Sequence, residues 1–517
     1  MTSDQPPATG QGVSRRRFVE HITEGDRLNR LFVRTAMPQF GCHGRRSGRP
    51  EVPSRRLDAM NGPVSLPLDS VELSFRATGD ALVRRTLLPT GVRVLTEQMP
   101  GARSATVGFW VAVGSRDEGE GDRGSTHFLE HLLFKGTPTR SALDIAVAFE
   151  SVGGEHNAAT GKESTCYYAR VRDVDLDDAV DALADMVTSS VLDPGEFETE
   201  RGVILDELAM ADDDPSDVGG ERLFESVFGD HALGRPIGGS PESIRAASRD
   251  EVHRHYLRTY RPRDLVVTVA GAVDHDRLVD RLRVAMTRSD WSTDAASPVA
   301  RRSASDPGGE AAPRQGEPLV VVRRPLEQTT LLLGVPGLPV TDERRSAMAV
   351  LNSVLGGGMS SRLFQEVRER RGLAYSVYSF APSYSDAGLF GLYAGCAPAN
   401  VGDVARLMLE QLDAVATDGI TADEHRRALG QLGGAAALAL EDSDTRMNRL
   451  GRAELSMGEF VDLDASLTRL AAVALDDVRD LAATLRSGPL STVVVGEVDE
   501  STLPVPATTS ASSSVLP

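Results

Sequence analysis

The chain has 517 residues, roughly three to four times the length of a typical domain, which predicts at least two domains. Hydrophobic residues make up 40% and charged residues 25% of the chain, a balance typical of folded globular proteins. The net charge of −19 argues against nucleic-acid binding, and no apolar run is long enough to cross a membrane, so we expect neither partner.

The N-terminal part differs from the rest in composition. Residues 1–60 contain 11 arginines against 6 acidic residues and are rich in Pro, Gly and Ser. We therefore predict that residues 1–80 form an Arg-rich, disordered extension. The acidic residues argue against a transit peptide, and a true start of translation at Met37 or Met60 is the alternative explanation.

Cysteine use bears on the compartment. Cys42, Cys166 and Cys396 are few, odd in number and far apart, so they predict no disulfide framework. A reducing, cytoplasmic location is the simpler interpretation.

From residue 81 onwards the hydrophobic pattern predicts alternating strands and helices. Strands are expected at Val92–Glu97, Ala105–Val113, Glu155–Ala159, Ser164–Val171 and Leu265–Ala272. Helices are expected at Thr126–Phe134, Ala142–Val152, Leu176–Ser190, Pro194–Ala211 and Glu242–Arg258.

A Pro-, Gly- and Ser-rich linker is predicted at residues 297–318, and after it the order of elements repeats. Strands are expected at Leu319–Arg323, Thr329–Val335, Tyr375–Ala381, Leu389–Ala397 and Leu490–Val498, and helices at Arg344–Leu355, Ser361–Arg371, Val401–Ala416, Ala422–Leu440 and Leu475–Arg486. The sequence thus predicts two α+β domains related by duplication, over residues 81–296 and 319–505, with a disordered tail at 506–517.

One helix carries the strongest chemical signal. His127 and His131 are four residues apart in the predicted helix Thr126–Phe134, so their imidazoles project side by side, and Glu130 lies beside them. The other residues make this helix apolar on nearly all sides, which predicts that it is buried. A divalent cation would compensate the polar groups, whereas a pair of satisfied core histidines is the structural alternative.

A third metal ligand is expected from an acidic residue elsewhere, because catalytic zinc usually has three protein ligands. The predicted helix Pro194–Ala211 offers Glu200 and Glu207, seven residues apart. They share one helical stripe with the apolar residues Phe197, Val203, Ile204 and Leu208. A role in binding or supporting a metal explains two carboxylates on such a stripe, and exposed glutamates on a surface helix are the alternative.

Four segments together resemble one known family. HFLEHLLFKGT, Gly153–Thr160, Thr199–Leu208 and Ser360–Ser379 look like the pitrilysin/insulysin family of inverzincin zinc peptidases, in which the zinc motif is reversed relative to H-E-x-x-H. The resemblance extends over roughly residues 82–498. It is closest to the processing-peptidase branch, the bacterial homologues of the mitochondrial processing peptidase catalytic subunit.

The resemblance implies a role for each matching residue. It makes His127, His131 and Glu207 the ligands of one Zn²⁺ per chain, Glu130 the general base, and Glu200 a second acid that supports the site. Asn157 and Ala158 match an edge strand along which substrate lies, and Arg368 and Tyr375 match a pair that contacts a substrate carbonyl oxygen near the metal. The implied activity is zinc-dependent endopeptidase cleavage of unfolded peptides or short protein segments.

The resemblance also implies an assembly. The two domains would form half of a clamshell peptidase chamber, completed in a homodimer in which Arg368 and Tyr375 act on the partner's zinc site. The acidic net charge leads us to expect basic peptide substrates. A non-catalytic structural or regulatory subunit of the same fold is the main alternative, and a metalloenzyme of other chemistry is a second.

Overall fold

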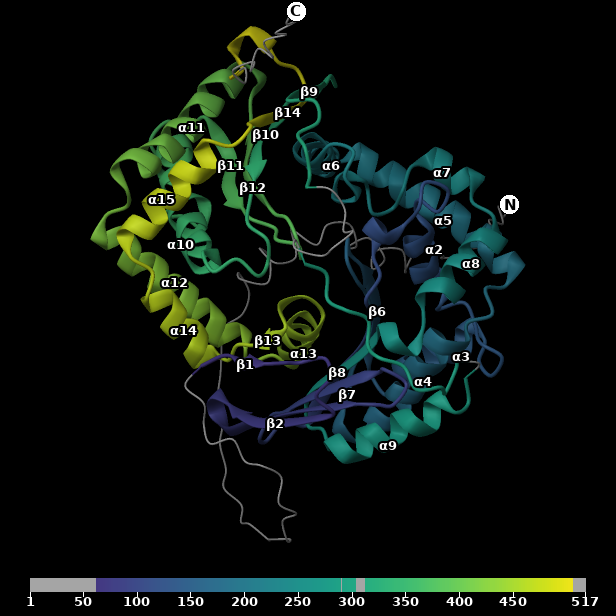
Figure 1. The fold of residues 1–517 in the computed structure, drawn as a ribbon. Helices are drawn as coiled ribbons and strands as arrows, with labels where there is room; N and C mark the ends of the chain where they lie inside the picture. The colour runs from purple at the N-terminus through teal and green to yellow at the C-terminus, as the bar shows by residue number, and fades with distance from the viewer. Residues whose placement is uncertain (1–61, 290, 304–311, 505–517) are drawn as a thin grey trace, which may run out of the picture.

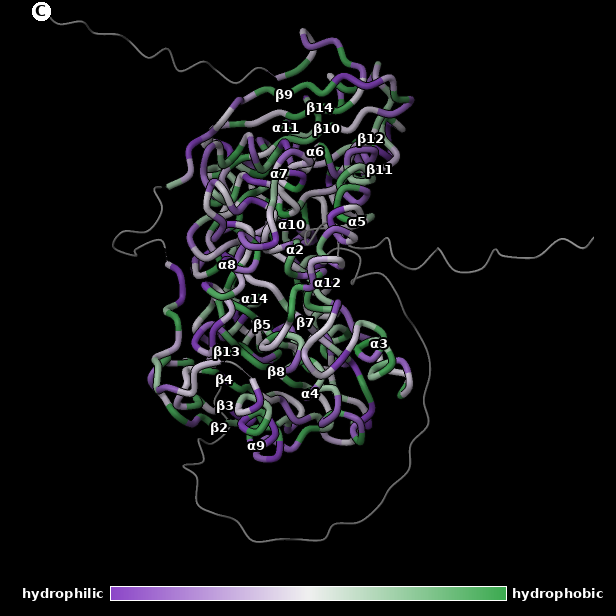
Figure 2. Tube along the Cα trace, turned by 90° about the vertical axis from the view of Figure 1, so that its right-hand side faces the viewer, coloured by the Kyte–Doolittle hydropathy of each residue, from purple (hydrophilic) through white to green (hydrophobic). Residues whose placement is uncertain are grey.

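The computed structural model describes residues 62–289, 291–303 and 312–504. In it the chain forms two α+β halves, each built around one sheet (Figure 1). Hydrophobic residues run along the strands of both sheets (Figure 2). Among the described residues, no helix has both the length and the apolar character needed to cross a bilayer.

The first half contains a seven-stranded sheet in the order β2-β3-β4-β8-β5-β7-β6. Its strands are β2 (Glu72–Ala77), β3 (Ala81–Leu87), β4 (Arg93–Gln98), β5 (Ser104–Val111), β6 (Glu155–Thr160), β7 (Thr165–Arg172) and β8 (Leu265–Gly271). Neighbouring strands are antiparallel except β4 and β8, which are parallel. Strand β6 therefore lies at one edge of the sheet.

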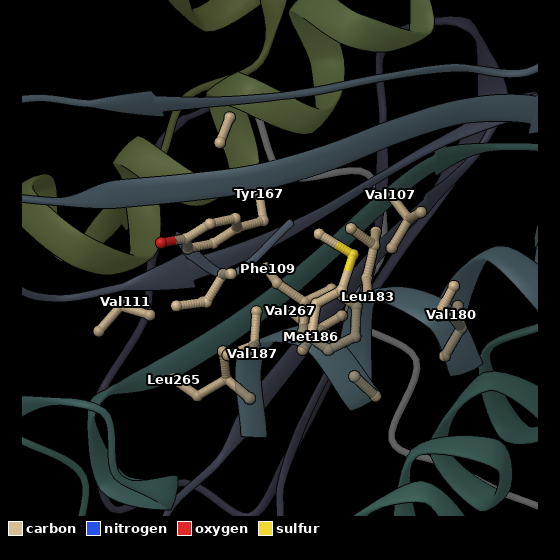
Figure 3. Packing of buried hydrophobic residues seen from close by; sticks show 14 of the residues in the cluster. Val107, Phe109, Val111, Tyr167, Val180, Leu183, Met186, Val187, Leu265 and Val267 are labelled. Carbon is tan, nitrogen blue, oxygen red and sulfur yellow. The ribbon is translucent and has the colours of Figure 1, made fainter. Parts of the chain in front are cut away.

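The helices of the first half are α2 (Ser125–Leu132), α3 (Ala142–Glu150), α4 (Leu176–Ser189), α5 (Pro194–Asp213), α6 (Pro215–Phe228), α7 (Pro241–Ala246), α8 (Arg249–Thr259) and α9 (His275–Met286). The main core forms where α4 packs on the central strands. There Leu183 and Met186 lie against Val107 and Phe109 of β5 and Val267 of β8 (Figure 3).

The second half contains a five-stranded sheet in the order β11-β12-β10-β14-β9. Its strands are β9 (Leu319–Val322), β10 (Thr329–Pro336), β11 (Ala374–Phe380), β12 (Leu389–Cys396) and β14 (Ser491–Val495). Its helices are α10 (Arg345–Gly356), α11 (Val401–Asp418), α12 (Ala422–Ala439), α13 (Ser443–Arg452), α14 (Leu463–Ala471) and α15 (Leu475–Arg486), and a short pair joins β1 (Val64–Ser65) to β13 (Glu459–Phe460).

The two sheets have the same topology, as the predicted duplication requires. The order β4-β8-β5-β7-β6 corresponds strand by strand to β9-β14-β10-β12-β11, and in both sheets only the first pair is parallel. The hairpin β2–β3 is an addition to the first sheet. By this correspondence β11 is the counterpart of β6, and α10, which has no histidine, is the counterpart of α2.

One helix from each half packs on the sheet of the other half. Helix α6 packs against β10 and β14 of the second sheet, whereas α13 packs against β8, β5 and β4 of the first. Trp110 of β5 is buried with Met447 and Leu450 of α13, and Leu223 of α6 is buried with Leu332 of β10. The two halves therefore share two apolar interfaces.

Buried ion pairs accompany the α13 interface. Arg85 of β3 donates two hydrogen bonds of 3.1 Å to Glu454, and both side chains are fully buried. Glu97 of β4, also buried, accepts hydrogen bonds from Arg446 and Arg449 of α13. Breaking a buried ion pair leaves an unpaired charge in the interior, so these contacts favour one register of α13 on the sheet.

Several sequence predictions need correction. The predicted extension 1–80 ends too late, because β2 pairs with β3 along its whole length, while residues 1–61 lie outside the described residues. The predicted helix Glu242–Arg258 is two helices, since Ser248 caps the start of α8 by accepting from Glu251 N. Within the predicted helix Ser361–Arg371, Phe364–Glu369 is a π-helical turn.

The domain boundaries are also less simple than predicted. Residues 443–460, predicted to belong to the second domain, pack on the first sheet. In the described part of the linker, Arg301 donates hydrogen bonds to the carbonyl oxygens of Leu66 and Glu454. The predicted tail, residues 506–517, lies entirely outside the described residues.

Candidate metal centre

A buried carboxylate caps the helix that carries the two histidines. Glu118 is 5% exposed, and its two oxygens accept hydrogen bonds from the backbone N–H groups of Gly124 (2.8 Å) and Thr126 (2.7 Å) at the start of α2. These groups have no partner within a helix, so the carboxylate satisfies them. Burial nevertheless raises the pKa of Glu118 to about 7.

A buried histidine supports the same turn of α2. His255 of α8 lies 3.0 Å, through Nε2, from the Thr126 hydroxyl, and its Nδ1 accepts from Arg258 at 3.0 Å. Burial, together with the charge of Arg258, lowers the pKa of His255 to about 4. The ring is therefore neutral at pH 7, and its Nε2–H donates to Thr126.

Helix α5 brings the two predicted glutamates to α2. Asp193 caps it by accepting from Gly195 N (2.8 Å) and Glu196 N (3.1 Å), and Pro194 occupies its first turn. The Phe197 ring stacks on Phe128 of α2 with centroids 4.3 Å apart.

The burial of α5 follows the prediction only in part. Phe197, Glu200 and Ile204 are buried, but Val203 is 39% exposed. The buried stripe is therefore narrower than the sequence predicted.

The three predicted ligands come together. The Nε2 atoms of His127 and His131 are 3.3 Å apart, and Glu207 Oε2 lies 3.3 Å from His131 Nε2 and 3.7 Å from His127 Nε2. Tetrahedral zinc with bonds of about 2.0–2.1 Å needs ligand atoms about 3.3 Å apart, so these donors fit such an ion. Among the described residues, they form the one group of three with metal-ligand spacing.

Glu200 holds the far side of the His131 ring. Its Oε2 lies 2.9 Å from His131 Nδ1, and its Oε1 lies 2.7 Å from Lys135 Nζ. Burial opposes a charge on His131, but hydrogen bonds to Glu200 and Glu207 outweigh it and raise the pKa of His131 to about 9. Burial alone would raise the pKa of Glu200, yet the bonds from His131 and Lys135 bring it below its usual range.

His127 has a different environment. Burial lowers its pKa, and its Nδ1 has no hydrogen-bond partner among the described residues. The Gly238 backbone passes close by: a Cβ there would lie 3.5 Å from His127 Nδ1 and 2.9 Å from Leu208 Cδ2. The His127 ring is thus placed by packing, and the His131 ring by a carboxylate.

Glu130 lies on α2 between the two histidines and is partly exposed. Its charge favours the protonated form of both rings, and within the described residues no hydrogen bond or ion pair holds its carboxylate. A carboxylate so placed is available to take a proton from a group at the three donors.

Asn157 and Ala158 lie on the edge strand β6, which packs against α2. The Ala158 side chain is buried, and its backbone N–H donates to Asn157 Oδ1 at 2.8 Å. The predicted substrate strand is thus an edge beside the metal centre. In this structure the Asn157 side chain covers one of its donors.

Arg368 and Tyr375 lie in the other half. The Arg368 guanidinium stacks over the Tyr375 ring at 4.9 Å and the Phe364 ring at 4.6 Å, and Tyr375 is 73% exposed. They line a pocket with Gln328, Leu373, Cys396 and Asn400. Across the described residues no hydrogen bond, ion pair or ring contact joins them to the three donors, so the structure does not bring this pair to the centre of its own chain.

Sequence reasoning missed Glu118, His255 and Lys135. Glu118 and His255 contact α2 through long-range packing that leaves no local pattern. The sequence does single out Lys135, because it is one of only two lysines in a chain with 56 Lys and Arg residues, and this rarity could have drawn attention to it.

Comparison with known proteins places this geometry in context. A family profile described as insulinase, peptidase family M16, matches residues 93–240, and one described as peptidase M16 inactive domain matches residues 246–432. Three similar proteins are described as uncharacterized zinc proteases. The one from Streptomyces coelicolor is 49% identical to this chain, over 82% of this chain and 91% of the relative. Those from Mycobacterium tuberculosis and Bacillus subtilis are 46% identical (80% of this chain, 93% of the relative) and 38% identical (78% and 96%).

Solved structures share the fold. A peptidase M16 inactive domain from Pseudomonas fluorescens superposes with a TM-score of 0.72 at 18% identity, covering 80% of this chain and 98% of that one. A protease from Helicobacter pylori gives 0.71 at 21% identity, with 80% and 98% coverage.

Proposed function

The chain belongs to peptidase family M16, the insulinase family, and from this premise we propose that it is a zinc-dependent endopeptidase with one zinc ion per chain. The observation that carries the proposal is the spacing of His127 Nε2, His131 Nε2 and Glu207 Oε2, at 3.3 to 3.7 Å. Two imidazoles and one carboxylate are a ligand set of catalytic zinc sites, which keep a fourth position open.

Glu130 is the general base of the proposed reaction. When bound, zinc acidifies a water molecule and polarises the scissile carbonyl. Glu130 accepts the proton of the attacking water on its carboxylate and returns it to the departing amide nitrogen. Its partial exposure and its lack of a described partner support this role.

The proposed substrate is a peptide in extended conformation that adds to the free edge of β6. Backbone groups on such an edge bind a strand regardless of its sequence, which suits a processing-type peptidase acting on unfolded segments. Asn157 then releases the Ala158 N–H that it now covers. The net charge of −19 supports a preference for basic peptides.

The remaining groups are proposed to come from a second copy of the chain. Tyr375 is exposed, and Arg368 stacks on it and holds its ring. In a homodimer the pair would reach the partner's metal centre and steady the oxyanion, a contribution of about 2–4 kcal/mol for a single donor. The separation of this pair from the donors of its own chain supports the arrangement.

The test is hydrolysis of a quenched library of basic peptides by the purified protein and by Glu130→Gln. Because Glu130 is not a ligand, the variant is expected to keep about one zinc per chain and to lose kcat by several orders of magnitude. Zinc content is measured on both proteins by atomic emission.

Each outcome separates the proposal from its alternatives. Cleavage that stops with chelation and with Glu130→Gln supports the peptidase. A wild type that binds zinc but cleaves nothing favours the non-catalytic subunit. Equal cleavage by both proteins contradicts the role of Glu130.

A further inference from the structure

The side-chain cation of Lys135 lies next to the metal centre and has no role in the proposed reaction. Lys135 is in the turn after α2, where its backbone N–H donates to Leu132 O at 3.0 Å. Its Nζ lies 2.7 Å from Glu200 Oε1, and the other oxygen of Glu200 lies 2.9 Å from His131 Nδ1. A row of three side chains thus leads from Lys135 through Glu200 to a proposed zinc ligand.

The residue type at this position is unusual for the chain. Of its 56 Lys and Arg residues only Lys135 and Lys162 are lysines, so an ion pair in this protein is ordinarily made by arginine. Arg140, a few residues away, pairs with Asp185 in this way and has the same side-chain exposure as Lys135, 29%. The presence of a lysine beside Glu200 therefore indicates that an arginine could not make the same contact with Glu200.

The chemistry of the two cations explains the difference. A guanidinium presents a planar fork that binds both oxygens of a carboxylate, whereas an ammonium is a compact point charge. Glu200 has its two oxygens on two different partners, and its side chain is only 4% exposed. An arginine fork would compete with His131 for Oε2, while lysine occupies Oε1 alone.

We propose that Lys135 is a positioning residue of the metal centre, which holds Glu200 Oε1 so that Oε2 orients the His131 ring toward the metal. It also keeps the Glu200 carboxylate away from the metal, so that the fourth position stays open. The inference rests on the proposed zinc site, because it assigns Lys135 a role through one of its ligands.

The test measures zinc affinity by competition with a chromophoric chelator, together with the visible spectrum of the cobalt-substituted protein. Losing the direct partner of a metal ligand usually weakens metal binding about 10- to 100-fold. Because Lys135 acts on His131 through Glu200, we expect Lys135→Met and Lys135→Arg to weaken zinc binding by about tenfold and to shift the cobalt bands. Arg140→Met is the matched control, since it removes an equally exposed cation from a carboxylate away from the metal.

A double variant separates positioning from general damage. If Lys135 acts through Glu200, Glu200→Gln with Lys135→Met binds zinc no more weakly than Glu200→Gln alone. Full rescue by Lys135→Arg, or additive losses in the double variant, would overturn the inference. Unchanged affinity in Lys135→Met with normal zinc binding by the wild type overturns this inference alone, whereas a wild type that binds no zinc overturns the proposed function as well.

Discussion

Glu118 shows how a single buried carboxyl group links pH to the metal centre. Its pKa is raised from 4.5 to about 7 in the folded protein, so the fold binds its proton more tightly than the unfolded chain does. The stability that this group contributes is complete below pH 4.5 and is lost as the pH rises through about 7. Above that pH the ionised carboxylate caps α2 at a desolvation cost.

We therefore predict that Glu118→Gln flattens the dependence of stability on pH between 4.5 and 7. Because one proton is involved, Glu118 contributes at most about 1.4 kcal/mol per pH unit to the slope of the free energy of unfolding against pH. Urea unfolding of the metal-free protein at several pH values measures it. Glu120→Gln, at an exposed position of the same loop, should keep the wild-type slope, and an unchanged slope in Glu118→Gln would contradict the shifted pKa.

At this scale the sequence predicted the three candidate metal ligands that the structure brings together, but not the residues that support them. His127 and His131 meet because a helix places residues four apart side by side, and that holds for any helix. That Glu207 joins them depends on the packing of α5 on α2, which the resemblance supplied and the stripe of apolar residues only suggested. Glu118 and His255 reach α2 from other elements, and a single sequence does not encode such contacts in any local pattern.

Strand β6 is the element on which the proposed substrate depends. It lies at the edge of the first sheet, and the Ala158 N–H points to the Asn157 side chain instead of to β7. Its counterpart in the second half, β11, is also an edge strand and carries Tyr375. The duplication has therefore placed the residues that we propose to contact substrate on equivalent edges of the two sheets.

We predict that Ala158→Pro lowers kcat/KM about tenfold or more and leaves the zinc content unchanged. Proline removes the one N–H that a substrate strand would use there but breaks no bond to β7. Peptide hydrolysis and zinc analysis measure the two effects. Ala158→Gly keeps the N–H and is the control; equal kcat/KM in the proline variant and the wild type would argue against binding along β6.

Two of the helices that the sequence failed to predict, α6 and α13, were missed for the same reason. Helices α6 and α13 pack on the sheet of the other half, so part of their apolar face is explained only by a partner far away in the sequence. In α13, arginines surround Met447 and Leu450, and in isolation this pattern resembles a solvated helix. Strands of the repeated core were predicted better, because their hydrophobic alternation is local.

On the scale of the whole molecule, helices α6 and α13, each packed on the sheet of the other half, join the two halves into one unit. We call them the exchanged helices. Gly451 of α13 lies directly on Trp110, and a Cβ at this position would come within 2.5 Å of the indole ring. On the sheet side, Gly108 approaches Met447 with similar closeness. Glycines on both surfaces thus allow α13 to lie close to the sheet.

We predict that Gly451→Ala destabilises the protein by about 1–3 kcal/mol, because the methyl group overpacks a buried interface. The wild type should unfold in urea in one transition, and the variant in two as the halves separate. Gly434→Ala in α12 is the control: its Cβ meets no atom within 4 Å, so it should stabilise the protein by up to about 1 kcal/mol. Two transitions already present in the wild type would show that the exchange does not couple the halves.

The exchanged helix α13 also has a consequence for biosynthesis. The strands of the first sheet leave the ribosome early, but the helix that covers one of its faces is encoded near the end of the chain, at Ser443–Arg452. Until then Trp110, Val266 and Ala270 have no cover from it, and the nascent protein exposes an apolar surface of the kind that chaperones bind. A message cut short after the linker would therefore yield an aggregation-prone fragment in place of an independent catalytic domain.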